Sequence, residues 1–430
     1  MNMSKFQIAI ILGAIALLSV AVMIITGILP GLRGDESAKG NIVMWGFEND
    51  AIFNDSFHEF AQSRPNVQIK YLKKTRADFE SEFLNAIARG ESPDLIVFPS
   101  DLLSKHKDKL SFAPSIQMTE KEITQQFVES AKSFLGPKNE VMGIPLYADS
   151  IILYFNKDIF TQNFITLPPK IWDEFLNAAQ KMTTKDDSGN ILISGAALGR
   201  ASNINNATEI LTALFLQAGE NIVDDKGQVV LGNIPQGSNS AVRPAEFALR
   251  FFADFANSTK TAHSWSAALP EAGDAFTGGK LAMYLGFVSE YNLISSKNPH
   301  LNYGVAALPQ LAKDIRPVTS GYVYALSVPK ASANQSLAWG LAKFLTNSKI
   351  SALLAKSRND VSPRRDVLPS YSGDSVKSVF AESMLALKIW NNPDPARSET
   401  ILYSLIEDLA LGKSTMRDAI DKAKAKFSNR

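Results

Sequence analysis

Strand-like and helix-like segments alternate near the start of the chain, and this alternation restricts the fold more than any other feature of the sequence. Apolar runs suited to strands are separated by segments with apolar residues at helical spacing, in the order Ile42–Trp45, Ile52–Ala61, Val67–Tyr71, Phe79–Ile87 and Leu95–Phe98. This order is typical of a largely parallel sheet with helices on both faces. The sequence therefore predicts an α/β fold, in which ligands bind beyond the carboxyl ends of the strands.

Aromatic and acidic side chains stand at two of these expected strand ends. Trp45 ends the first strand and Glu48 follows it, while Phe98 ends the last strand and Asp101 follows it. Ligand contact and core packing are equally good interpretations for the two rings, because large aromatic side chains are often buried. Asp101 could bind a ligand, but an acid at this position could also fix a turn or cap a helix.

Residues 143–160 are the second informative stretch. Pro145 has a fixed φ and no backbone donor, so it indicates a bend rather than the centre of a strand. Ile151–Phe155 is an unbroken apolar run, which is typical of a strand buried on both faces. Tyr147 and Asp149 lie between them, either in a polar turn before a second lobe or in a hinge that faces a cleft.

The later part of the chain contains a second sheet-forming region and then mostly helices. Together with the first region it predicts two α/β lobes. We expect residues 41–147 to form the first lobe, with 320–365 returning to it. Residues 148–319 are expected to form the second lobe, with 366–430 returning to it.

The N-terminus carries an uncharged apolar run, Gln7–Leu29, after a short segment, residues 1–6. A bilayer-spanning helix needs about 20 apolar residues, whereas a cleaved signal peptide has a core of roughly 7–15 followed by a small-residue site. No good cleavage site follows, so the sequence favours an uncleaved transmembrane anchor, with residues 30–40 as a linker. We expect a single-pass protein of the cell membrane, with a short cytoplasmic N-terminus and the globular part extracellular or periplasmic.

Composition excludes several classes of function. The 44 basic and 43 acidic residues leave a formal net charge of +1, and no basic run with interleaved aromatics indicates nucleic-acid binding. The chain has no cysteine, so disulfides and thiolate metal sites are impossible. Its four histidines are scattered without ligand spacing, and we expect neither a metal site nor a cofactor.

Catalytic motifs are also missing. Gly412–Thr415 looks like the end of a phosphate-binding loop, but Glu407 occupies the position of the required glycine. Paired carboxylates such as Asp149 and Glu290 could act as acid and base in glycoside cleavage. A carbohydrate-active enzyme therefore stays as an alternative, although we expect a protein without enzyme activity.

Several short motifs resemble one known family when their order and spacing are taken together. They are Ala88–Val97, Gly143–Tyr147, Tyr154–Asp158, Pro168–Glu174, Phe276–Met283 and Asn302–Val305. From about Asn41 to the C-terminus the chain resembles the extracellular solute-binding proteins of ABC importers for sugars, the group that includes the maltodextrin-binding proteins. This resemblance implies a two-lobed, type II periplasmic-binding-protein-like fold that closes over its ligand by hinge bending.

The resemblance also implies a monomeric receptor that delivers a sugar or oligosaccharide to the transmembrane subunits of an ABC permease. Relatives often stack a tryptophan on the sugar after the strand that ends near Gly286, but this chain has none there, which leaves Trp265, Phe287 and Tyr291 as candidates. The cysteine that carries a lipid anchor is also missing, so the apolar N-terminal run is expected to replace it. The ligand-binding residues implied by the resemblance are Trp45, Glu48, Phe98, Asp101, Tyr147, Asp149, Trp265, Phe287, Glu290, Tyr291, Tyr322 and Arg365.

These residue types suit a sugar. Aromatic faces pack on the C–H faces of a sugar ring, and carboxylates accept hydrogen bonds from its hydroxyl groups. The same acidic and aromatic set would also suit a peptide or a polyamine on the same fold, because a fold does not determine its ligand.

Overall fold

The computed structural model describes residues 40–224, 226–234 and 243–429. Within these residues, neighbouring strands follow the order β2-β1-β3-β9-β4-β7-β6-β5, and β8 pairs with β4. The strands are β1 (Gly40–Gly46), β2 (Val67–Lys73), β3 (Leu95–Pro99), β4 (Ile144–Asn156), β5 (Thr184–Lys185), β6 (Ile191–Ala196), β7 (Leu281–Phe287), β8 (Tyr303–Ala306) and β9 (Gly321–Ser327).

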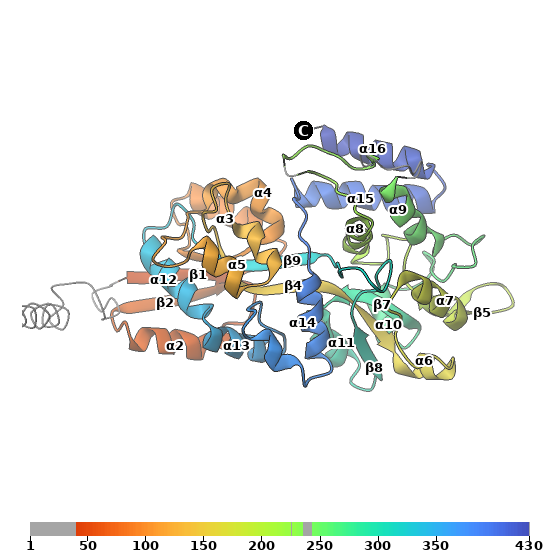
Figure 1. Ribbon diagram of the computed structural model, residues 1–430, viewed down its shortest axis with the longest axis horizontal. Helices are drawn as coiled ribbons and strands as arrows, with labels where there is room; N and C mark the ends of the chain where they lie inside the picture. The colour runs from red at the N-terminus through yellow and green to blue at the C-terminus, as the bar shows by residue number, and fades with distance from the viewer. Residues whose placement is uncertain (1–39, 225, 235–242, 430) are drawn as a thin grey trace, which may run out of the picture.

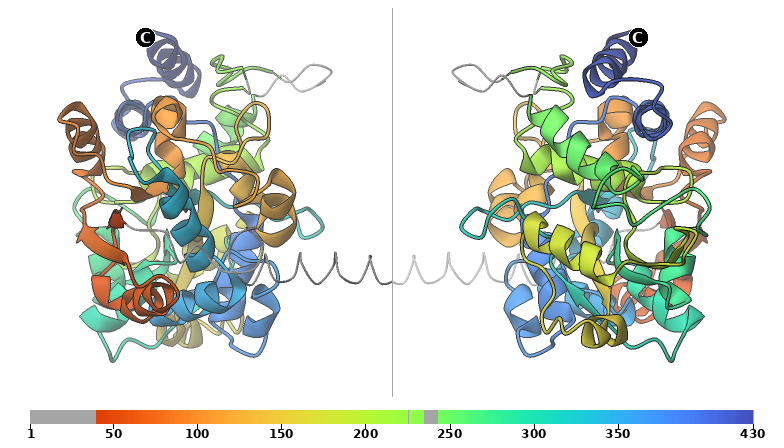
Figure 2. Two further views of the ribbon diagram at one scale, coloured as in Figure 1. Left: turned by 90° about the vertical axis from the view of Figure 1, so that its left-hand side faces the viewer. Right: turned by 90° about the vertical axis from the view of Figure 1, so that its right-hand side faces the viewer.

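Helices flank the strands, as the two end-on views in Figure 2 show. They are α2 (Asn54–Gln62), α3 (Phe79–Ala88), α4 (Leu103–His106), α5 (Glu120–Gln126), α6 (Lys157–Gln162), α7 (Trp172–Met182), α8 (Ala207–Gln217), α9 (Pro244–Asp254), α10 (Ala272–Thr277), α11 (Glu290–Lys297), α12 (Gln335–Leu345), α13 (Ser348–Ser357), α14 (Lys377–Ala386), α15 (Pro395–Ala410) and α16 (Met416–Ser428).

The predicted strand–helix alternation at the start of the chain is confirmed. β1 pairs in parallel with β2 on one side and with β3 on the other. Side chains on successive strand residues point to opposite faces of the sheet. Phe98 therefore packs against Phe79 and Phe83 of α3 on one face. Val97 belongs to the core on the other face, together with Trp339 of α12. Both faces of this sheet are therefore buried, which explains the nearly continuous apolar runs.

Strand β4 connects the two halves of the molecule. Its first half, Ile144–Ser150, pairs with β9, and its second half, Ile151–Asn156, pairs with β7 and β8. We call the part around β1–β3 the first lobe and the part around β5–β8 the second lobe (Figure 1). Both halves of β4 contribute to the buried core, so the strand positions the lobes relative to each other.

The bend and polar turn predicted around Pro145 are wrong. Residues 144–156 form one strand, and Pro145 is accommodated where the register of pairing with β9 shifts, between Pro145 and Tyr147. A shift of this kind tolerates the missing N–H, which a regular ladder would not. Tyr147 and Asp149 therefore lie on a strand that joins the lobes.

The predicted lobe boundaries stay predictions. The expected N-terminal segment, membrane anchor and most of the linker fall in residues 1–39, outside the described residues. Among the residues that are described, no helix combines the length and the apolar character needed to span a bilayer.

Helix α7 lies so close to β6 that a side chain at Gly195 would collide with it. A Cβ atom at this position would be 2.0 Å from the backbone oxygen of Ala179. We expect Gly195→Ala to reduce stability by about 1–3 kcal/mol, the usual cost of overpacking a core. The thermal unfolding midpoint measures this. Gly373→Ala is the control, since no atom lies within 4 Å of its Cβ position, and an equal midpoint for both variants would contradict the prediction.

Candidate functional site

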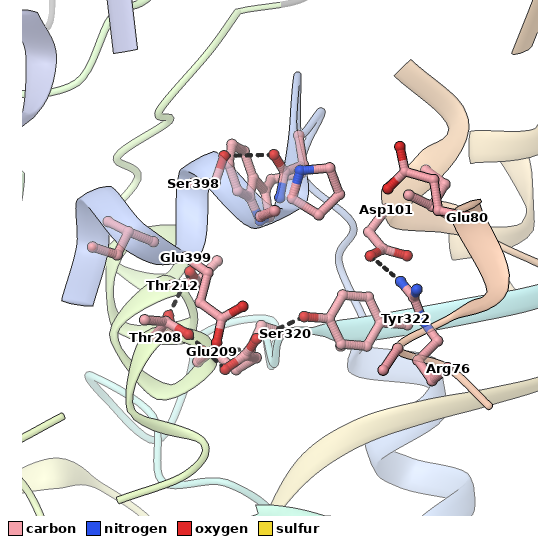
Figure 3. A pocket seen from close by; sticks show the side chains of 18 of the residues that line it. Arg76, Glu80, Asp101, Thr208, Glu209, Thr212, Ser320, Tyr322, Ser398 and Glu399 are labelled. Atoms are coloured by element: carbon pink, nitrogen blue, oxygen red, sulfur yellow. Dashed lines mark hydrogen bonds and ion pairs between the residues drawn. The ribbon is translucent and has the colours of Figure 1, made fainter. Parts of the chain in front are cut away.

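A cavity of about 380 Å³ lies between the two lobes. Ligand pockets commonly measure roughly 300–1,000 Å³. Side chains from both lobes and from the start of β9 line the cavity (Figure 3). The principal polar and aromatic ones are Arg76, Glu80, Asp101, Thr208, Glu209, Tyr322, Tyr324, Trp390, Asn392, Ser398 and Glu399.

Two tyrosines of β9 form an aromatic surface in the cavity. Tyr322 and Tyr324 are paired in register with Asp149 and Tyr147 of β4, so all four side chains lie on the same face of the two strands. Tyr324 stacks on Tyr147 with ring centroids 4.6 Å apart, and Tyr322 stacks on Phe287 at 5.7 Å. The stacking fixes the tyrosine rings that line the cavity.

The first lobe contributes an ion pair. Arg76 follows β2 and donates to Asp101, which lies in the turn directly after β3. Asp101 is 7% exposed, and its other oxygen, Oδ1, has no hydrogen-bond partner among the described residues. Burial raises the pKa of Asp101, while Arg76 opposes that rise. A buried acceptor without a donor is costly, so a ligand that reached this carboxylate could offset the penalty by donating a hydrogen bond.

The second lobe contributes two further carboxylates, Glu209 of α8 and Glu399 of α15. Figure 3 shows them across the cavity from Arg76 and Asp101. Glu209 accepts a 2.7 Å hydrogen bond from the hydroxyl of Tyr322. Partial burial and the nearby Glu209 carboxylate raise the pKa of Glu399. This side of the cavity is therefore negatively charged.

Arg358 organises a second polar cluster on the same face of the central strands. Its Nε donates to Glu48 at 3.0 Å, its Nη2 lies 3.3 Å from Asp360, and its guanidinium carbon lies 3.6 Å from the ring centroid of Tyr147. The cation is thus held by two acids and one aromatic face. Asp149 is a neighbouring carboxylate, and it accepts a 3.1 Å hydrogen bond from the backbone N–H of Ser289 in the second lobe. Burial raises the pKa of Asp149 to about 7.

The lobes also touch each other beyond the central strands. Ser104 donates to Asn391, and Lys105 Nζ lies 3.5 Å from the carboxylate of Asp394. Elsewhere, Asn292 donates to the backbone oxygen of Arg358 at 3.1 Å. The lobes are therefore in direct contact in this structure.

Sequence comparison identifies the family. The model of the family described as "Bacterial extracellular solute-binding protein" matches residues 46–351, which is more than half of the chain. The chain belongs to this family.

Two curated relatives of this solute-binding protein match most of its length. A maltotriose-binding protein of Pyrococcus abyssi is 22% identical over 363 residues, covering 81% of this chain and 72% of the relative. A galactooligosaccharide-binding protein of Bacillus subtilis is 23% identical over 408 residues, covering 90% of this chain and 89% of the relative.

A solved structure shows the fold. The cyclic alpha-maltosyl-1,6-maltose binding protein from Arthrobacter globiformis gives a TM-score of 0.75 at 17% identity, covering 91% of this chain and 98% of that chain. The predicted two-lobed α/β fold of a solute-binding protein is thereby confirmed.

The structure brings six of the twelve predicted ligand-binding residues to the face of β4 and β9 that borders the cavity. Asp101 and Tyr322 line the cavity itself. Four others adjoin it through contacts described above, namely Glu48, Tyr147, Asp149 and Phe287.

Three predicted aromatic residues lie in the hydrophobic core. Trp45 and Phe98 pack among the side chains of α3 and the sheet, and Lys74 covers the ring of Trp45 at 4.0 Å. Trp265 is fully buried, and its indole N–H donates to Asn203. Our proposed site does not include these three residues.

The remaining predicted residues lie elsewhere. Glu290 accepts hydrogen bonds from Asn206, Tyr284 and the N–H of Phe287, all within the second lobe, and Tyr291 packs against other rings there. Asn206 precedes α8 but makes no side-chain capping bond to it, because its amide donates to Glu290.

Arg365 lies at a different cavity, lined by residues of α14 and the segment before β9. Its Nε donates to the backbone oxygen of Phe127, and its Nη2 lies 3.7 Å from Glu129. That cavity is on the opposite face of the central strands, because it is lined by Thr319 and Ser383, and Ser383 bonds to Ser150 of β4.

Most residues that line the cavity were not predicted from the sequence, among them Arg76, Glu209, Tyr324, Trp390 and Glu399. Arg76 could have been found, because it follows β2 as Asp101 follows β3. Tyr324 could also have been found, because it lies two residues after Tyr322 on the same face of a strand. Glu209, Trp390 and Glu399 carry no such signal, since the packing of α8, of α15 and of the segment before α15 brings them to the cavity.

The raised pKa of Asp149 predicts a specific pH dependence. Between the ordinary carboxyl pKa, about 3.9, and the folded value of about 7, the folded protein holds this proton more tightly than the unfolded chain. Stability is therefore lost as the pH rises through this range, and Asp149→Asn should remove the loss. We therefore expect the difference between the two unfolding midpoints, variant minus wild type, to grow as the pH rises through this range. Above about pH 7 the difference should stay constant.

The exposed Asp187 provides the control for this measurement. Asp187→Asn should not change the unfolding midpoint in this pH-dependent way. A difference for Asp149→Asn that is constant from about pH 4 to above pH 7 would contradict a raised pKa at this carboxyl.

Proposed function

We propose that this solute-binding protein captures a sugar or oligosaccharide between its lobes and delivers it to the transmembrane subunits of an ABC permease. The observation that carries the proposal is the cavity between the lobes, in which aromatic faces and hydrogen-bonding groups of both lobes converge. Tyr322, Tyr324 and Trp390 offer flat apolar area, and carboxylate, amide and hydroxyl groups surround them. The names of the two relatives, which bind maltotriose and galactooligosaccharide, support a saccharide ligand.

In the proposed mechanism the ligand bridges the lobes and stabilises the closed arrangement. Asp101 and Arg76 would hold it from the first lobe, and Glu209 and Glu399 from the second. A ligand that makes contacts with both lobes binds the closed state more tightly than the open state, so it shifts the population toward closure. The closed surface is then what the permease would recognise.

We further propose that the protein acts as a monomer outside the cytoplasm, tethered by the apolar run Gln7–Leu29. The family description, an extracellular solute-binding protein, supports this location for the globular part. A catalytic function has less support, because both oxygens of Glu290 are engaged in hydrogen bonds within the second lobe. That carboxyl group would have to lose these bonds before it could act with Asp149.

A thermal-unfolding screen tests the proposal. The full chain is purified in a detergent without a sugar headgroup and heated with malto- and galacto-oligosaccharides, amino acids, peptides and polyamines. A saccharide at a hundredfold its dissociation constant should add about 2.7 kcal/mol of stability and raise the unfolding midpoint. Stabilisation by peptides or amino acids, without any by a saccharide, would exclude the sugar.

Substitution of Asp101 tests the site. We expect Asp101→Asn to weaken saccharide binding by about 10- to 100-fold, because a charged acceptor facing the ligand is worth about 1.5–3 kcal/mol. Isothermal titration calorimetry measures this. Asp108→Asn, at an exposed carboxylate of the same lobe, is the matched control. Equal affinities of the two variants would remove Asp101 from the site.

A further inference from the structure

The charges lining the cavity are unequal. Four carboxylates and one guanidinium face it, those of Glu80, Asp101, Glu209, Glu399 and Arg76. A saccharide without charge needs hydrogen-bond acceptors, but it does not need an excess of negative charge. The imbalance therefore bears on which kind of saccharide the cavity suits.

Neighbouring cations neutralise the acids on one side only. Asp101 is paired with Arg76, and Glu80 lies 2.8 Å from the ammonium group of Lys105. In the part of the chain that the structure describes, Glu209 and Glu399 form no ion pair with any Lys, Arg or His. Their two charges on α8 and α15 thus remain uncompensated at the second-lobe side.

A second, independent observation also points to a ligand that donates hydrogens. Asp101 lines the cavity and is 7% exposed, and its Oδ1 is buried without a hydrogen-bond partner among the described residues. Figure 3 shows this carboxylate opposite the two glutamates, with Tyr322 between them. The two sides of the cavity therefore both present acceptors, and a ligand rich in N–H and O–H donors would satisfy both.

We infer that the ligand is an amino-bearing saccharide whose ammonium group lies between Glu209 and Glu399. This inference rests on the proposed saccharide-binding function and narrows it to a cationic sugar. An ammonium group supplies three donors and one positive charge, which match two carboxylates that lack a cation. The ring hydroxyls would donate to Asp101, and the ring would pack on the tyrosines of β9.

A linear polyamine shares the ammonium chemistry but not the ring. The tyrosine and tryptophan faces, together with the amide of Asn392 and the hydroxyls of Thr208 and Ser398, suit a hydroxylated ring better than a flexible methylene chain. The experiment therefore includes both kinds of cation.

The test compares oligosaccharides of equal length on the purified full chain, in a detergent without a sugar headgroup. The panel contains glucosamine oligomers, their N-acetylated forms, the uncharged glucose oligomers and spermidine. Calorimetry is done below the pKa of the sugar amine, at low and at high salt. We expect the glucosamine oligomer to bind at least tenfold more tightly than either uncharged counterpart, with a smaller advantage at high salt because salt screens the attraction.

Variants locate the effect. The double variant Glu209→Gln, Glu399→Gln should lose the preference for the amino sugar, whereas Glu382→Gln, at an exposed carboxyl outside this cavity, should keep it. Circular dichroism checks that each variant is folded.

The outcomes separate the two hypotheses. Uncharged oligosaccharides that bind as tightly as the amino sugar would overturn this inference and leave the proposed function intact. A preference that survives in the double variant would also overturn it. If spermidine binds and no saccharide does, the inference and the proposed function are both overturned. The same holds if neither the panel nor any other saccharide binds.

Discussion

The molecule depends on one ladder of backbone hydrogen bonds, that between β4 and β9. β4 pairs with β9 over its first half and with β7 and β8 over its second half, so both lobes are built on the same strand. Because paired residues of an antiparallel ladder point to the same side, this pairing places Tyr147, Asp149, Tyr322 and Tyr324 together. The face that borders the cavity is thus determined by strand register, before any lobe motion is considered.

The charges around the cavity are arranged differently on its two sides. On the first-lobe side two cations are matched by acids, Arg76 by Asp101 and Arg358 by Glu48 and Asp360. Ion pairs of this kind hold side chains in place when they are removed from water. Among the described residues, Glu209 of α8 and Glu399 of α15 have no such partner, so the second lobe supplies most of the unbalanced field in the cavity.

Local patterns were sufficient to predict the elements of the first lobe, because its strands are buried on both faces and its helices have apolar stripes. They failed at Pro145, where a shift in register allows a proline within a strand, and this could not be inferred without the partner strand. For the site, position after a strand indicated Asp101, which lines the cavity, and the family resemblance indicated Tyr322, which also lines it, and Asp149, which pairs with Tyr322. Trp265 was a poor candidate because a buried tryptophan can satisfy its N–H internally, here with Asn203. Glu399 and Trp390 were out of reach, because only tertiary packing brings the C-terminal segment to the cavity.

Because β4 belongs to the sheets of both lobes, the lobes are linked when the protein denatures. If either sheet separated, β4 would lose one set of partners, and the edges of β9 or of β7 would be left without hydrogen bonds inside an apolar core. The same core cluster also extends from α3 in the first lobe to α8 in the second. Part of the interior is therefore shared between the lobes, and the two should melt as one cooperative unit despite their separate appearance.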